Sequence, residues 1–196
     1  MNGPPTRVVL PALTFFGFRG ASEYLEDLVA QIDTPRLAFI RITYFNQLVF
    51  QVPRLFRFIG RVQILEQADT KDAQVYFRSS HVDISTSHHS EEAESRRTHL
   101  YLRILCEGSD WQVSQLTEVL SQSSGMLSNV SHIFIGSYGP GRRWRHDIDH
   151  IEWLELFRQF TAVETLQVST RLAWPVADAL NDVTVEMVPS MLPALR

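Results

Sequence analysis

The chain has 196 residues, about the length of one domain. Its 44% hydrophobic and 11% aromatic residues are enough for a sizeable core and exclude a wholly disordered protein. The 18 basic and 22 acidic side chains leave a formal charge of −4, which excludes a strongly basic nucleic-acid-binding protein. No apolar run approaches the ~18 residues that span a bilayer, so we expect no membrane partner.

The cysteine content indicates the compartment. Cys106 is the only cysteine, so no internal disulfide can form, and we expect a reducing compartment, the cytoplasm or nucleus. We predict that Cys106 is a small buried hydrophobe rather than a nucleophile. Residues 8–16 are apolar like a short signal peptide, but Pro11 interrupts the run and no A-x-A cleavage site follows.

The first half of the chain alternates strand and helix signals. The apolar frame that starts at Leu13 (L-x-x-F-x-F) predicts a strand, and it returns 24 residues later at Leu37. Between the two frames, Ser22 is predicted to cap a helix that ends before Pro35. Pro53 suits the first turn of a second helix. A less regular strand is expected at residues 75–77.

The polar stretch 79–98 is predicted to be a surface loop, at the tip of a hairpin between residues 82–84 and 100–102. A helix then follows Asp110 and stops at Gly125. Further strand frames start at Val130 and Val163, and a capping box at residues 149–152 opens the helix between them. Pro175 is predicted to open the last helix.

Strand, turn, helix and return, in units of roughly 24–33 residues, are typical of a leucine-rich-repeat solenoid. Such units stack because none can bury its apolar face alone. We therefore predict one α/β domain over residues 1–196: a horseshoe fragment of about six to seven irregular repeats. Its parallel strands would line the concave face, with helices on the convex face. The alternative is a doubly wound α/β domain, but its usual glycine-rich phosphate loop is absent.

Several units resemble the repeat region of fungal F-box leucine-rich-repeat-like proteins. The matching segments cover nearly the whole chain: LTFFGFRG (13–20), YLEDLVAQIDTPRL (24–37), FNQLVF (45–50), DWQ (110–112), IEWLEL (151–156) and FTAV (160–163). The resemblance implies a repeat region that holds the target of a ubiquitin ligase and contains no catalytic residues. In that family an upstream F-box recruits the ligase. We find no F-box helices in this chain, so ligase subunits are expected as partners only if an F-box lies upstream.

The two ends predict a truncated solenoid. The chain starts inside a strand motif, and the L-P-A-L of residues 10–13 returns at residues 192–195. Solenoids need polar capping units at both ends, and neither end supplies one. We therefore expect a part of a longer protein or an inert truncated gene product.

Outward-facing strand positions give the candidate binding site. In the predicted register they form three rows with four arginines, five Phe or Tyr residues and no acid. Arginine and tyrosine are over-represented at binding hot spots, which predicts a protein partner that is acidic or phosphorylated. Ordinary cross-strand packing explains the aromatic residues equally well. The predicted protein-binding residues are Phe39, Arg41, Tyr76, Arg78, Tyr101, Arg103, His132 and Phe134.

Two further motifs suggest other chemistry. His146, Asp149 and His150 have a spacing that could hold a metal, as in a metal-dependent hydrolase, but a polar loop before a capped helix explains them too. Gly139-Pro140-Gly141 precedes a basic stretch that lacks the Lys-Ser/Thr of a nucleotide loop, which favours a surface turn. We therefore expect a non-enzymatic protein-interaction module without a cofactor.

Overall fold

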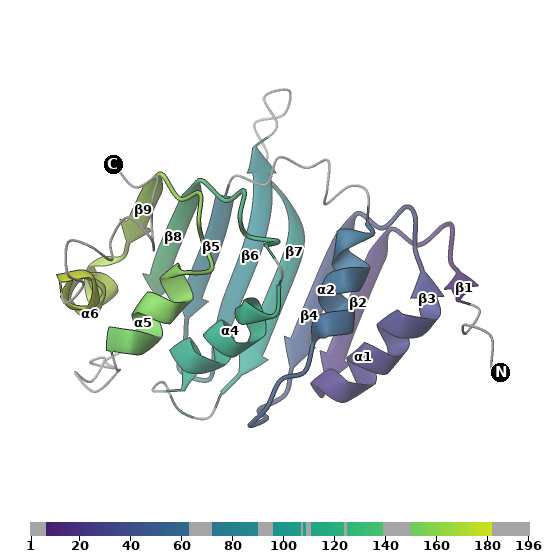
Figure 1. Cartoon of the computed structure of the whole chain (residues 1–196), viewed down its shortest axis with the longest axis horizontal. Helices are drawn as coiled ribbons and strands as arrows, with labels where there is room; N and C mark the ends of the chain where they lie inside the picture. The colour runs from purple at the N-terminus through teal and green to yellow at the C-terminus, as the bar shows by residue number, and fades with distance from the viewer. Residues whose placement is uncertain are drawn as a thin grey trace.

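A computed structural model describes residues 7–62, 72–89, 96–106, 108, 111–123, 125–138 and 150–181. Seven strands form one open sheet in the spatial order β2-β4-β7-β6-β5-β8-β9 (Figure 1). The strands are β2 (Phe15–Gly20), β4 (Phe39–Tyr44), β5 (Asp72–Phe77), β6 (His81–His89), β7 (Arg96–Leu105), β8 (His132–Ser137) and β9 (Thr165–Val168). A small parallel pair, β1 (Val8–Val9) and β3 (Ile32–Asp33), lies beside the sheet near the N-terminal end.

The sheet is mostly parallel. The β2–β4, β4–β7, β5–β8 and β8–β9 pairs are parallel, and β6 is antiparallel to both of its neighbours. The α/β class with a mainly parallel sheet is confirmed. The expectation that all strands are parallel and follow one another in chain order is wrong, because two strands, β7 and β6, lie between β4 and β5. β6 lies between β5 and β7 and is antiparallel to both, while β7 is parallel to β4.

The polar stretch predicted as a loop is mostly strand. β6 covers His81–His89 and β7 begins at Arg96. The hairpin itself is confirmed, since Val82 pairs with Ile104 and Ile84 pairs with Leu102 in antiparallel register. Buried and polar residues alternate over His81–Ser87, as is typical of a strand, and Val82 and Ile84 are fully buried. Polar side chains occupy the alternate positions, so the segment looks like a loop by composition.

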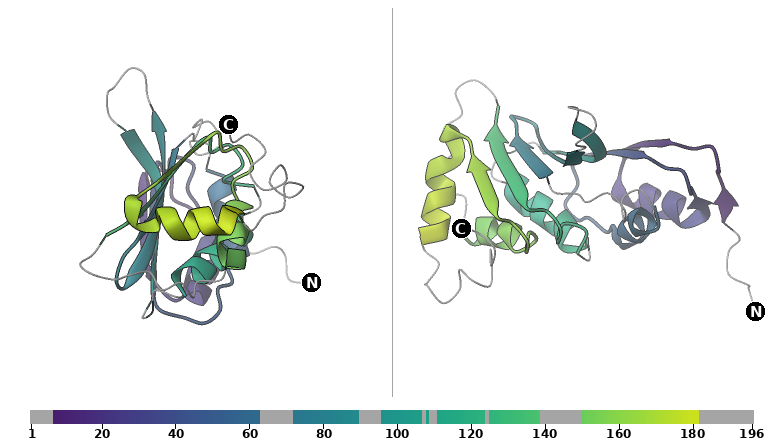
Figure 2. Two further views of the ribbon diagram at one scale, coloured as in Figure 1. Left: turned by 90° about the vertical axis from the view of Figure 1, so that its left-hand side faces the viewer. Right: turned by 90° about the horizontal axis from the view of Figure 1, so that it is seen from above.

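The described helices lie along one face of the sheet, except the last, which lies at the end of the sheet (Figure 2). They are α1 (Ser22–Gln31), α2 (Pro53–Gly60), α4 (Gln112–Ser121), α5 (His150–Phe157) and α6 (Thr170–Asn181), the last of which covers the end of the sheet beside β9. Pro53 opens α2 as predicted. Two helix starts are wrong: Ser22 lies inside α1 rather than capping it, and Pro175 lies inside α6.

The core fills the space between the sheet and these helices. Trp153, Phe157 and Phe77 are completely buried, and their rings contact one another across α5 and β5. Burying a side chain of this size stabilises the fold by about 1.5–3 kcal/mol. One continuous cluster of buried residues runs from Phe16 to Ala179. The sheet therefore shares a single core from β2 to β9.

Side chains of the helices also hold the connections in place. The buried Glu26 of α1 accepts hydrogen bonds from the backbone N–H groups of Arg54 and Leu55, at 2.8 and 2.7 Å, where α2 begins. Glu118 of α4 accepts from the Phe50 N–H at 2.9 Å, and Gln122, just after α4, accepts from the Val52 N–H and donates to the Phe50 C=O. These contacts satisfy backbone groups that neither a helix nor the sheet serves.

No helix within the described ranges is long and apolar enough to cross a membrane. Cys106 is buried as predicted, and its thiol donates to the Gln115 side chain at 2.8 Å. Burial raises the pKa of Cys106 to about 11, because the charged thiolate is disfavoured there. The thiol is therefore protonated at neutral pH and is a poor nucleophile.

Candidate protein-binding face

No described helix covers the side of the sheet opposite α1, α2, α4 and α5, and we call this side the open face. Successive strand residues point to opposite sides. Ile40, Ile42, Leu102 and Ile104 are buried toward the helices, so the residues between them point to the open face. Strand register places one line of side chains across it: Gly17, Arg41, Tyr101, Ser85, Gln74, Phe134 and Gln167.

All eight predicted binding residues lie on the open face or at its edge. Phe39 and Arg41 come from β4, Tyr101 and Arg103 from β7, and His132 and Phe134 from β8. Tyr76 comes from β5, and Arg78 follows that strand directly. The predicted rows are correct at the two ends, where Phe15 lies beside Phe39 and His132 beside Thr165.

The rows are wrong in the middle. The prediction puts Gln74 and Tyr101 in one row with Phe39 and His132. In the structure Tyr101 lies beside Arg41 and Gln74 lies beside Phe134, which belong to the next predicted row. The error is two residues along each strand. Because side chains alternate with a period of two, this shift leaves every residue on the expected face and changes only its neighbours.

The first cluster of the open face surrounds Arg41. Its guanidinium carbon lies 5.6 Å from the ring centre of Phe39 and 5.6 Å from that of Tyr101. Phe15 extends the aromatic surface, with its ring centre 5.4 Å from that of Phe39. Stacking on two rings orients the guanidinium and leaves its N–H donors free to meet a ligand. Among the described residues, no carboxylate lies within ion-pair distance of Arg41.

An aspartate stands at the centre of the open face, so the expectation of a face without acids is wrong. Asp83 of β6 has a side chain only 5% exposed and receives two hydrogen bonds from Arg103, at 2.7 and 3.2 Å. Arg78 Nε and His81 Nε2 lie 3.4 and 3.5 Å from Asp83 Oδ2, the oxygen that also accepts the longer Arg103 hydrogen bond. Arg78 and Arg103, two of the four arginines in the predicted rows, therefore already have a carboxylate partner.

The surroundings of Asp83 shift neighbouring pKa values. The Asp83 hydrogen bond raises the pKa of Arg103 and outweighs the effect of burial. Burial, together with the charge of Asp83, raises the pKa of Tyr101, whose hydroxyl also bonds Arg103. Burial lowers the pKa of His81, although the Asp83 carboxylate acts in the opposite direction. Asp83 and Arg103 thus form a charged pair that is built into the sheet.

The second cluster is aromatic. The ring of Tyr76 lies 5.4 Å from that of Phe134 and 5.1 Å from that of Tyr138. Arg78 covers Tyr138 at 5.0 Å. Gly136 makes this packing possible, because a Cβ at that position would come within 2.6 Å of Phe134 and 2.9 Å of Tyr76.

A shallow cleft of about 480 Å³ lies next to the second cluster, between β5, β8 and β9. Its polar lining includes Asp72 and His132, whose side chains are 3.6 Å apart, and Gln167. The predicted site residue His132 is half exposed here. The open face thus has a cationic aromatic half near β2 and β4 and a more neutral, hollowed half near β8.

The alternative metal site is described only in part. His146 and Asp149 lie outside the described residues, as does the loop 139–145. The His150 Nε2 atom lies 2.9 Å from Asp178 of α6, a contact that links two helices. No group of three or more His, Cys, Asp or Glu residues that could hold a metal occurs in the described part of the chain.

Asp83 is a residue of the open face that was not among the predicted binding residues. The signal was present, because the alternation Val82-Asp83-Ile84 places Asp83 opposite two buried positions. What was lacking was the position of β6 between β5 and β7, which brings Asp83 beside Arg103.

The comparisons with known proteins give no family. No protein-family model matches the chain, and no match was found among curated proteins or solved structures. The resemblance to F-box leucine-rich-repeat-like proteins therefore stays a prediction, and the function has to be argued from the open face.

Proposed function

We propose that the chain is a non-enzymatic protein-interaction module that binds its target through the open face. We further propose that it is a variant leucine-rich-repeat solenoid, similar to the target-binding repeats of an F-box adaptor. The strand-helix-strand units β2-α1-β4 and β8-α5-β9 support this, since each brings two parallel strands side by side. Ligase subunits become partners if an F-box precedes these repeats.

The environment of Arg41 is the observation that carries the proposal. A guanidinium held between two aromatic rings combines contact area with directed donors, as hot-spot residues do. Arg19 extends the same edge, with its guanidinium 5.7 Å from the ring of Phe45. Folding does not require an exposed arginine on a sheet to stack on aromatic rings, so the stacking of Arg41 on Phe39 and Tyr101 supports a role in binding.

The partner follows from the distribution of charge. Asp83 pairs with Arg103 and Arg78 and offsets one of their two charges, whereas Arg19 and Arg41 have no carboxylate partner among the described residues. The arginines without a carboxylate partner therefore lie over β2 and β4. An acidic or phosphorylated segment of a target protein would meet the fork of Arg41 there. We place this binding in the cytoplasm or nucleus, because the single cysteine forms no internal disulfide.

The test is a binding screen with acidic, phosphoserine and neutral peptides. The chain should select acidic or phosphorylated sequences, and Arg41→Glu should weaken that binding at least about tenfold, which corresponds to about 1.4 kcal/mol. Arg158→Glu is the matched control, because Arg158 is an exposed arginine at the end of α5, away from the open face.

Chemical shifts or cross-links from a selected peptide should map to β2, β4 and β7. Equal binding by both variants, or contacts confined to the helical side, would reject the open face as the binding site. We test Arg41 rather than Arg103, because glutamate at position 103 would face the buried Asp83 and unsettle the fold.

A further inference from the structure

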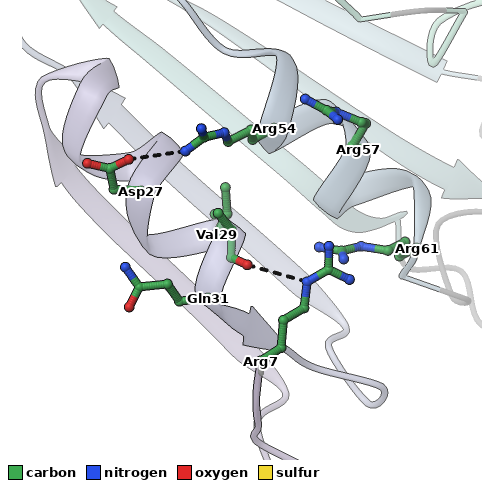
Figure 3. Close-up of a pocket in the computed structure, with 8 residues that line it drawn as sticks. Arg7, Asp27, Val29, Gln31, Arg54, Arg57 and Arg61 are labelled. Atoms are coloured by element: carbon green, nitrogen blue, oxygen red, sulfur yellow. Dashed lines mark hydrogen bonds and ion pairs between the residues drawn. The ribbon is translucent and has the colours of Figure 1, made fainter. Parts of the chain in front are cut away.

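A large pocket on the helical side of the molecule is lined by arginines. Its volume is about 1100 Å³, and it lies between α1, α2 and the residue that precedes β1 (Figure 3). Four arginines and one aspartate contribute to its walls: Arg7, Arg54, Arg57, Arg61 and Asp27. This local excess of positive charge stands in a chain whose formal charge is −4.

Helix geometry brings three of these arginines together. Arg54, Arg57 and Arg61 follow one another at spacings of three and four residues along α2 and its C-terminal end, which places them on one side of the helix. Arg7 approaches from the opposite wall, and Figure 3 shows Arg7 and Arg61 reaching toward each other across the pocket. The positions come from two separate parts of the chain, so the pocket depends on the tertiary fold.

The partners of the arginines leave most of the charge uncompensated. Only Arg54 has a carboxylate partner among the described residues, Asp27 at 3.1 Å, and both side chains of that pair are at least half exposed. Arg7 donates to the Ala30 carbonyl at 3.3 Å, and Arg57 to the Pro53 carbonyl at 3.2 Å. Arg61 lies over the Phe58 ring at 5.9 Å. Neutral acceptors and a ring orient these groups without cancelling their charge.

Both burial and the neighbouring charges act on Arg61. Burial lowers the pKa of Arg61, and the positive charges of Arg7 and Arg57 lower it further, while Asp33 acts in the opposite direction. Glu26 of α1 does not line the pocket; its buried carboxylate accepts hydrogen bonds from two backbone N–H groups at the start of α2. An anion in the pocket would relieve this repulsion.

We propose that this pocket binds a compact ligand with two or more phosphate groups, either free or carried on a lipid headgroup. Guanidinium forks match phosphate oxygens, and several arginines around one cavity favour clustered phosphates over a single carboxylate. The pocket lies on the helical side, so it is separate from the open face and does not depend on the proposed function.

The first experiment measures binding of inorganic tripolyphosphate to the full chain by calorimetry at low and moderate salt. We expect saturable binding of one ligand per chain that weakens as salt rises. Orthophosphate and poly-glutamate should bind at least about tenfold more weakly, since each lacks clustered phosphates. Poly-glutamate binding equal to or tighter than tripolyphosphate would overturn the proposed ligand class.

The second experiment assigns the site. The double variant Arg57→Gln/Arg61→Gln should weaken tripolyphosphate binding at least about tenfold, while the exposed control Arg158→Gln should not. Arg7→Gln lies outside α2, so it tests the same pocket if the double variant folds poorly. Unchanged binding in both pocket variants, or no saturable binding to the original chain, would overturn the proposal.

A third experiment separates the two sources of phosphate. The chain is mixed with vesicles that contain phosphatidylinositol 4,5-bisphosphate or phosphatidylserine at equal surface charge. Arginine-dependent binding to the first vesicles alone would support the pocket and identify a lipid headgroup. Tripolyphosphate binding without vesicle binding would support a free ligand. Equal binding to both vesicles that persists in the pocket variants would show surface attraction only and count against the proposal.

Discussion

Asp83 decides how the charges of the open face are arranged. It is the only carboxylate near Arg103, Arg78 and His81 among the described residues, and its side chain is almost fully buried. A buried carboxylate is stable in the sheet only when donors of this kind surround it. Arg103 therefore stabilises the fold by pairing with Asp83, whereas the more exposed Arg41 is available for binding.

We predict that Asp83→Asn destabilises the protein. The amide keeps the shape but loses the charge that holds Arg103, and the free energy of unfolding should fall by about 1–3 kcal/mol. Chemical denaturation measures the loss. Asp27→Asn is the control, because the Asp27–Arg54 pair is well exposed and should contribute less than about 1 kcal/mol. Equal losses in the two variants would contradict the structural role of Asp83.

His81 should make stability depend on pH. Burial lowers its pKa, and Arg103 and Arg78 add to the effect, so the folded chain takes up this proton at lower pH than the unfolded chain. The free energy of unfolding should therefore decrease as pH falls below about 6.5, the ordinary histidine pKa, and stay constant above it. His81→Asn should show a smaller loss between pH 7.5 and 5.5 in urea titrations. A larger loss in the variant would show that the Asp83 attraction dominates instead.

At the scale of elements, α1 and α4 stabilise their neighbours through side chains that contact backbone groups. Val52 precedes α2 and supplies no side-chain cap. Glu26 of α1 takes that role from a distance of 28 residues in the chain. Glu118 of α4 and Gln122, which follows that helix, do the same for residues 50–52. Such tertiary caps couple α1 and α4 to the segment where α2 begins.

Replacing Glu26 tests this coupling. Glu26→Ala leaves two N–H groups of α2 without a protein acceptor, so we expect a loss of about 1–2 kcal/mol in thermal or chemical unfolding. Glu26→Gln should lose less, because the amide retains one oxygen. Glu23→Ala is the matched control on the exposed side of the same helix and should cost only a few tenths of a kcal/mol. A similar loss at both glutamates would contradict the capping role.

At the scale of the whole molecule, the antiparallel strand β6 joins two parallel groups. β2, β4 and β7 lie on one side of it, and β5, β8 and β9 on the other. Because one continuous core runs under both groups, we infer that the described part of the chain is stabilised as one unit. The same arrangement separates two surfaces, the open face on one side of the sheet and the arginine pocket on the helical side.

Local patterns predicted much of the fold correctly. The alternation of apolar residues identified β2, β4, β8 and β9, and the same period placed Phe39, Arg41 and Phe134 on the open face. Pro53 marked the start of α2 for a steric reason that needs no tertiary partner. These features depend on a few neighbouring residues, so they can be read along the chain.

Strand order and charge pairing depend on contacts between distant residues. The hairpin of β6 and β7 was expected, but its position between β4 and β5 depends on the packing of distant strands and helices in the core. This position changed the neighbours of Tyr101 and Gln74. The same insertion put Asp83 against Arg103, and the folding of α2 against α1 gathered Arg7 with Arg61. Alternation specifies which side a residue faces, whereas its partners across the sheet come from long-range packing.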